Sequence, residues 1–238
     1  MCIRDRPKTK AAASTLLDTE VAEEPEAPTQ EEVTELEATI IADTPMDEAT
    51  IAGGLDALVN NAGVMDESDM ERTLEVNLDG VAAVTAAIAP LLGAGGRVIN
   101  VSSGAGLRAA GGLAPGGREA RRAATVADIR AAAARLAVGS ETVYGLSKAA
   151  LTAYTKLAAR TYPALRVNAC SPGFCRTEIA GPNADYSERE PKAPALGADV
   201  ITKLLFDDAL SPATGKFFKE CSKPGTAHEN AVSREQPW

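Results

Sequence analysis

Residues 96–103 read Gly-Arg-Val-Ile-Asn-Val-Ser-Ser, a short apolar run that ends in two serines. A run of this length, bounded by glycine and polar residues, is typical of a buried strand. Residues 55–60 and 165–170 have the same pattern, and each is followed by polar or turn-forming residues. These three segments are predicted to be strands of one sheet.

Helical patterns separate and follow these strands. Helices are expected at residues 78–92, 118–136, 144–161 and 199–205, and a last short strand at residues 215–218. Strands that alternate with helices predict an α/β fold, with a parallel sheet covered by helices on both faces. Ligands bind beyond the carboxyl ends of the strands in such sheets. Asn60, Ser103 and Ser171 are expected at those ends.

The charge divides the chain into two parts. The 238 residues carry a formal net charge of −9, and all of this imbalance lies in residues 1–50. No basic residue occurs there after Lys10, and prolines interrupt the segment. We expect residues 1–50 to be an acidic, disordered segment and residues 51–238 to form the folded domain. The negative charge and the 4% aromatic content argue against a nucleic-acid partner.

Membrane, secretory and metal signals are not found in the sequence. The longest apolar stretch, residues 81–96, is too short to cross a bilayer, and the first ten residues are not followed by an apolar signal core. The four cysteines form no CxxC pair, and there is a single histidine. We therefore expect a cytoplasmic protein with no metal site and no membrane partner.

Tyr144 and Lys148 stand four positions apart on a predicted helix and so share one of its faces. A phenol titrates near pH 10, and a nearby ammonium favours its ionised form. The pair is therefore suited to move a proton between a hydroxyl and a carbonyl group, although this spacing is also common by chance.

Further motifs accompany this pair in a fixed order. Asn-Asn-Ala-Gly occupies residues 60–63, Asn77 follows, and the double serine closes residues 96–103. Pro172 and Gly173, with Thr177 behind them, follow the third strand. This ordered set resembles the short-chain dehydrogenase/reductase family over about residues 53–220. The resemblance implies a Rossmann-type, doubly wound parallel sheet.

The resemblance implies a role for each matching residue. Tyr144 would give its proton to the substrate carbonyl oxygen, and Ser103 would hydrogen-bond the same oxygen. Lys148 would hold the nicotinamide ribose and lower the pKa of Tyr144, while Asn77 would hold a water that relays protons. Tyr144 and Lys148 would both contact the cofactor. The remaining cofactor contacts would come from Asn61, Ala62, Gly63, Pro172, Gly173 and Thr177.

The segment between Ser103 and Tyr144 is unusually long for this family. The insert, residues 104–140, is similar to that of the monomeric carbonyl reductases, as are residues 169–182 and the final Gln-Pro-Trp. This subgroup reduces aldehydes, ketones and quinones with NADPH. The resemblance implies a monomer that binds NADP(H) and a small-molecule carbonyl substrate. Residues 104–109 also fit GxGxxA, but we interpret them as a flexible entry to the insert.

One expected motif is not found. The family opens with a strand and a TGxxxGxG turn that holds the cofactor pyrophosphate, yet no glycine precedes Gly53. The sequence therefore predicts a sheet truncated at its N-terminal side, with residues 38–42 as a hypothetical substitute strand beside residues 55–60. Two functions remain open: an NADPH-dependent carbonyl reductase, or an inactive fragment or pseudoenzyme that cannot bind the dinucleotide.

Overall fold

The computed structural model describes residues 54–111, 122–136, 142–180, 190–210, 212–223 and 233–236. The expectations of disorder in residues 1–50 and of a strand at residues 38–42 lie outside these residues, as does the centre of the insert. All structural statements below concern the described residues.

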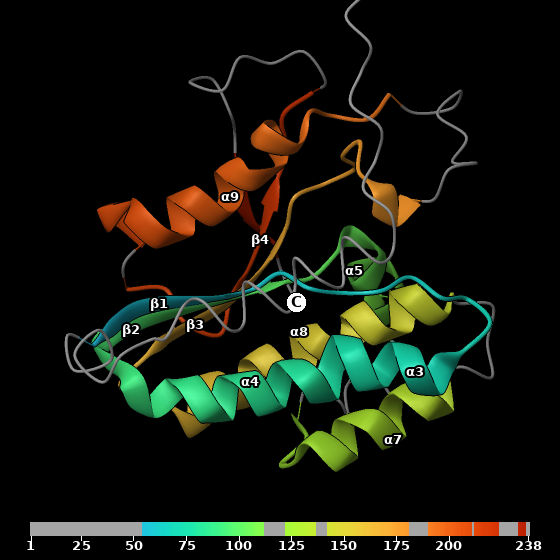
Figure 1. Ribbon diagram of the computed structural model, residues 1–238, viewed down its shortest axis with the longest axis horizontal. Coiled ribbons are helices and arrows are strands. Elements are labelled where there is room, and N and C mark those ends of the chain that lie inside the picture. Colours follow the sequence, from blue (N-terminus) through green and yellow to red (C-terminus); the bar gives the residue numbers. More distant parts are fainter. Residues whose placement is uncertain are drawn as a thin grey trace, which may run out of the picture. The chain divides into compact units, whose positions relative to one another are not determined.

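A five-stranded sheet forms the centre of the described domain, with its strands in the order β1-β2-β3-β4-β5 (Figure 1). The first four strands are parallel, and β5 is antiparallel to β4. Their bounds are β1 Leu55–Asn60, β2 Leu92–Val101, β3 Arg166–Ser171, β4 Phe217–Glu220 and β5 Ser233–Gln236. The predicted α/β fold with a parallel sheet is confirmed. The sequence analysis missed β5 because its residues, Ser-Arg-Glu-Gln, are all polar.

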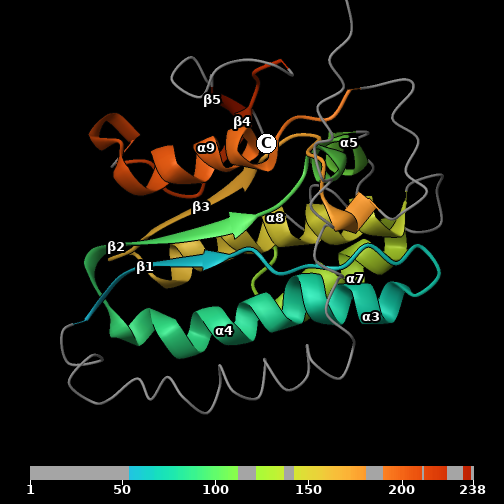
Figure 2. The same ribbon diagram turned by 45° about the horizontal axis from the view of Figure 1, so that its top comes forward.

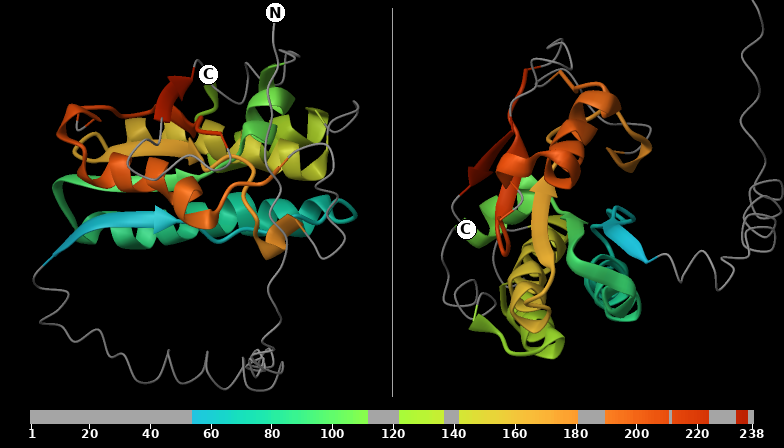
Figure 3. Two further views of the ribbon diagram at one scale, coloured as in Figure 1. Left: turned by 90° about the horizontal axis from the view of Figure 1, so that it is seen from above. Right: turned by 90° about the vertical axis from the view of Figure 1, so that its left-hand side faces the viewer.

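Helices cover both faces of the sheet (Figures 2 and 3). One face carries a continuous helical run and two further helices, and the other face carries α9. The run comprises α3 Met70–Leu74, η1 Glu75–Gly80, α4 Val81–Ile88 and η2 Ala89–Leu91, and the other helices are α7 Val126–Leu136, α8 Val143–Thr161 and α9 Pro194–Phe206. Short helical turns lie at η3 Glu178–Ala180 and η4 Asp208–Leu210.

Neighbouring residues of β2 supply two separate cores. Val98 packs with α4 and α8 residues such as Leu151, whereas Ile99 packs with Val200 of α9 and Phe218 of β4. Successive side chains of a strand point to opposite faces, so a strand with helices on both sides must be apolar at consecutive positions. This requirement explains the unbroken apolar run that the sequence shows at Val98 and Ile99.

The run Met70–Leu91 is long and apolar enough to cross a membrane by length and composition alone. Core helices pass the same test. Here Leu74 and Leu78 are almost fully buried in the core that also holds Val98 of the sheet. The apolar character of this run is therefore used in packing against the sheet.

Residues at the start of the insert differ from the prediction. The expected flexible entry is a helix, α5 Gly104–Gly111, which packs against α8. Glycine makes this packing possible, because a Cβ atom at Gly106 would lie 2.6 Å from the carbonyl carbon of Lys148 and 2.7 Å from the nitrogen of Ala149. The apparent GxGxxA motif is thus explained by close helix contact.

Replacement of Gly106 tests this contact. Gly106→Ala is expected to lower the free energy of unfolding by about 2 kcal/mol, because the added carbon meets the backbone of α8. Chemical denaturation measures the change. Gly93→Ala is the matched control, since nothing lies within 4 Å of a Cβ atom at Gly93. Equal effects of the two substitutions would contradict the close contact.

Candidate active site

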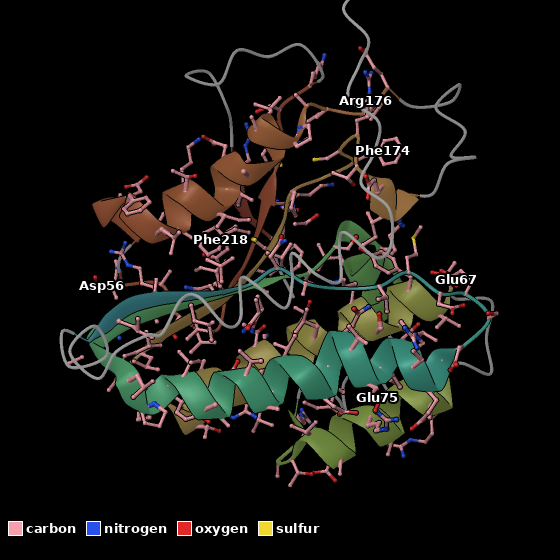
Figure 4. All side chains as sticks on the ribbon, viewed as in Figure 1. Asp56, Glu67, Glu75, Phe174, Arg176 and Phe218 are labelled. Atoms are coloured by element: carbon pink, nitrogen blue, oxygen red, sulfur yellow. The ribbon has the colours of Figure 1, made fainter. Side chains whose placement is uncertain are left out.

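The carboxyl ends of the strands gather the predicted catalytic side chains at one end of the domain. Figure 4 shows Glu67 and Phe174 at this end and Asp56, near the start of β1, at the other. Ser103 follows β2, and Tyr144 lies in the first turn of α8. Residues more than forty positions apart in sequence therefore meet here.

The first turn of α8 is held by two side chains. Thr142 caps the helix, and its hydroxyl oxygen accepts a hydrogen bond from the nitrogen of Gly145 at 3.0 Å. The carboxylate of Glu67 accepts from the backbone nitrogens of Val143 at 2.7 Å and Tyr144 at 3.3 Å. Bonds to the free N–H groups of a first turn stabilise the helix and fix its position. Tyr144 consequently projects from a fixed backbone.

Ser103 and Tyr144 are joined by a side-chain hydrogen bond and line one cavity of about 310 Å³. Ser103 Oγ accepts from the nitrogen of Ala105 at 3.1 Å, so its own hydrogen is left to donate. Burial raises the pKa of Tyr144, and the hydrogen bond with Ser103 opposes that rise. Both hydroxyl groups therefore stand at the wall of the cavity as hydrogen-bond donors at neutral pH.

Lys148 lies one helical turn further into the domain and is almost fully buried. Its Nζ donates to the carbonyl oxygen of Val101 at 2.9 Å and lies 5.7 Å from the ring centre of Tyr144. Burial lowers the pKa of Lys148 to about 8, partly opposed by Cys170. The predicted lowering of the Tyr144 pKa by Lys148 is wrong in its net direction, because burial of the phenol dominates.

Asn77 lies in a π-helical turn, η1, and its side-chain amide makes three hydrogen bonds among the described residues. Its Oδ1 accepts from the nitrogen of Val64 at 2.9 Å, and its Nδ2 donates to Val64 O at 2.8 Å and to Ser147 Oγ at 2.9 Å. Ser147 Oγ in turn donates to the carbonyl oxygen of Tyr144 at 2.8 Å. Asn77 is thereby connected to the helix that carries Tyr144.

Gly63 lies against both Asn77 and Lys148. A Cβ atom at this position would be 3.0 Å from Asn77 Oδ1 and 3.0 Å from Lys148 Nζ. The glycine of the Asn-Asn-Ala-Gly motif therefore keeps space open beside the ammonium group.

The predicted cofactor residues fall into two places. Pro172 and Gly173 follow β3, and Gly173 lines the cavity of Ser103 and Tyr144. Asn61 and Ala62 line a second cavity, of about 500 Å³, along β1. Thr177 is exposed beyond the end of β3. Six of the predicted site residues thus lie together: Gly63, Asn77, Ser103, Tyr144, Lys148 and Gly173. Asn61 and Ala62 line the separate second cavity.

Comparisons with known proteins identify relatives of this chain. The family model described as short chain dehydrogenase matches residues 8–115, and the one described as Enoyl-(Acyl carrier protein) reductase matches residues 114–196. Carbonyl reductase [NADPH] 1 of Homo sapiens is 32% identical over 197 residues, which are 71% of this chain and 69% of that protein.

The chain belongs to the short-chain dehydrogenase family. Its first match starts at residue 8, so the matched region includes the acidic segment. Carbonyl reductase [NADPH] 1 of Sus scrofa is 31% identical over 189 residues, 67% of this chain and 63% of that protein. The chain therefore spans about two thirds of the length of the carbonyl reductases that it matches.

Solved structures support the Rossmann-type fold. Salutaridine reductase from Papaver somniferum matches with a TM-score of 0.55 at 24% identity, covering 78% of each chain, which supports the fold alone. The 3-alpha-hydroxysteroid dehydrogenase from Pseudomonas sp. B-0831, complexed with NADH, matches with a TM-score of 0.53 at 25% identity. The match covers 80% of this chain and 78% of that one. The angucycline C-6 ketoreductase LanV with bound NADP matches with a TM-score of 0.52 at 26% identity. The match covers 73% of this chain and 64% of that one.

Sequence reasoning assigned no role to two groups that position this dehydrogenase-type site. Ser171 Oγ accepts from the nitrogens of Gly104 at 3.1 Å and Gly173 at 3.3 Å, and so joins the ends of β2 and β3. Lys192 and Glu220 form a buried ion pair, and Lys192 Nζ would lie 2.6 Å from a Cβ atom at Gly173. Only Ser171 carried a sequence signal, since it stands where a strand ends. The ion pair joins residues 28 positions apart and shows no motif.

The buried lysine predicts a pH-dependent stability. Below pH 8 Lys148 is charged in both the folded and the unfolded chain, and its burial costs stability. The cost declines between pH 8 and 10.5, where only the unfolded chain keeps the proton, and vanishes above that range. Lys148→Met is therefore expected to raise the free energy of unfolding at pH 7 by about 2 kcal/mol, allowing for the lost bond to Val101.

Urea denaturation of Lys148→Met and the parent chain between pH 7 and 10.5 measures this difference. The advantage of the variant should shrink steadily above pH 8. The exposed Lys223 provides the control, because Lys223→Met should give a difference that does not change with pH. A Lys148 variant destabilised to the same extent at every pH would contradict the buried, shifted lysine.

Proposed function

We propose that this short-chain dehydrogenase reduces the carbonyl group of a small molecule to an alcohol, with NADPH as the hydride source and Tyr144 as the proton donor. The observation that supports it most strongly is the hydrogen-bonded pair of Ser103 and Tyr144 at the wall of one cavity. Two hydroxyl groups so placed can bind a single carbonyl oxygen.

Ser103 and Tyr144 act on the substrate oxygen. The hydroxyl of Ser103 donates a hydrogen bond that stabilises the negative charge developing there. The raised pKa of Tyr144 keeps its phenol protonated at neutral pH, which suits a proton donor. The substrate becomes an alcohol when its carbonyl carbon receives a hydride and its oxygen receives the proton of Tyr144.

Lys148 and Asn77 support this proton transfer. An ammonium near the ring stabilises the phenolate that Tyr144 becomes after it gives up its proton. With a pKa of about 8, Lys148 is mostly protonated at neutral pH. Asn77 is bonded through Ser147 to the helix of Tyr144, and the second lone pair of its Oδ1 would hold the relay water of this proposal.

The residues near Lys148 fit a nicotinamide dinucleotide at its ribose end. Among the described residues, Lys148 Nζ makes one hydrogen bond, to Val101, which leaves two of its three N–H groups for ribose hydroxyls. Gly63 places no side chain beside that nitrogen. When bound, the dinucleotide supplies the hydride. The names of the relatives, carbonyl reductase [NADPH] and an NADP-bound ketoreductase, favour NADPH over NADH.

A second candidate function is an inactive fragment or pseudoenzyme that retains the catalytic residues without binding a dinucleotide. Its support is the sequence itself, in which no glycine precedes Gly53 and no TGxxxGxG turn is found. The pyrophosphate contributes much of the binding that orients such a cofactor. The two candidates differ in whether NADPH binds.

Replacing the proposed proton donor tests the first candidate. Tyr144→Phe and Ser103→Ala are each expected to lower kcat by about 100-fold or more, because each removes a hydroxyl from the substrate oxygen. NADPH oxidation with an aromatic aldehyde reports kcat, and fluorescence titration should show unchanged NADPH affinity.

Tyr162→Phe is the matched control, since Tyr162 follows the far end of α8, and it should retain the parent rate. If Tyr144→Phe kept the parent kcat, another group would be the proton donor and the proposed mechanism would be wrong.

A further inference from the structure

We propose that the substrate of this site carries a carboxylate, held by Arg108 and Lys219 while Ser103 and Tyr144 hold the carbonyl oxygen. This inference rests on the proposed carbonyl reduction and adds a substrate class to it. Arg108 comes from α5, the helix that opens the insert, and Lys219 comes from β4. Both line the cavity of Ser103 and Tyr144.

Gly104 shows how closely the two cations converge. A Cβ atom at Gly104, directly after Ser103, would lie 3.9 Å from Arg108 Nη1, 3.9 Å from Ser171 Oγ and 4.0 Å from Lys219 Nζ. These three polar groups surround one point beside the proposed carbonyl site. The absence of a side chain at Gly104 leaves that point open to a ligand.

Among the described residues, neither Arg108 nor Lys219 has an ion-pair partner. Among the described residues that line the cavity, Glu67 is the acidic one, and it already accepts two backbone N–H bonds at the start of α8. Residues 51–238, which carry no formal net charge, thus present two cations at the candidate active site. Arginine and lysine in such a position favour a carboxylate ligand.

Ser171 adds a neutral donor to the same place. Its Oγ accepts bonds from the nitrogens of Gly104 and Gly173, so its own hydroxyl hydrogen is left to donate toward the cavity. The remaining walls include Met65 and Phe174, which are apolar. With a volume of about 310 Å³, the cavity suits a small carbonyl compound with an apolar body and one acidic group.

Two aldehydes that differ only in charge test the inference. The probes are 4-formylbenzoate and its methyl ester, each reduced with NADPH by the full chain. The acid is expected to have a kcat/KM about tenfold or more above that of the ester, as a hydrogen-bonded ion pair would give. In Arg108→Met and Lys219→Met this preference should fall toward unity, mainly through the KM of the acid, while the ester is reduced as before.

Lys216→Met is the control, because Lys216 pairs with Glu235 outside the cavity lining, and it should keep the parent preference. An ester reduced as well as the acid by the parent chain, or an acid preference unchanged in Lys219→Met, would overturn the inference and leave the proposed reductase function standing.

If neither aldehyde is reduced, a binding measurement tests the anion site without the reaction. Calorimetry with 4-(hydroxymethyl)benzoate and its methyl ester, which contain no carbonyl to reduce, should show tighter binding of the acid, weakened in Lys219→Met. That result would support the anion site although the reductase proposal had failed. Equal binding of acid and ester, or displacement of the acid by NADPH, would overturn the inference; displacement would assign the two cations to the cofactor phosphates.

Discussion

The site depends on one buried contact, in which the ammonium group of Lys148 donates to the carbonyl oxygen of Val101 at the end of β2. This bond ties α8 to the sheet and thereby fixes the distance between Tyr144, one helical turn earlier, and Ser103, two residues after Val101. Glycines at positions 63 and 106 are required because the chain passes so close to Lys148 on both sides. A buried ammonium is costly, so its retention here agrees with a chemical role.

Much of this arrangement could be predicted from the sequence. Strands β1 to β3 contain short apolar runs, and polar residues at or after their ends, such as Asn60 and Ser103, mark the carboxyl ends of the parallel sheet. Tyr144 and Lys148 were found because helical spacing places them on one face. The local sequence pattern is sufficient to predict the position of a residue where its own strand or helix sets that position.

Other features depend on partners distant in the sequence and left no local pattern. The polar strand β5 forms because its backbone pairs with β4. Helix α5 forms where its glycines allow close contact with α8. The Lys192–Glu220 pair joins the segment after β3 to β4. The pKa of Tyr144 depends on burial by the whole fold, so the Lys148 spacing alone gave the wrong direction.

The proposed function requires that the space beside Lys148 and Gly63 receive the ribose end of a nicotinamide dinucleotide. The most direct test is a fluorescence titration of the 238-residue chain with NADPH, with NADH alongside. We expect saturable binding in the micromolar range, tighter for NADPH than for NADH. No binding at millimolar NADPH would contradict it, and the catalytic residues would then belong to a protein without reductase activity.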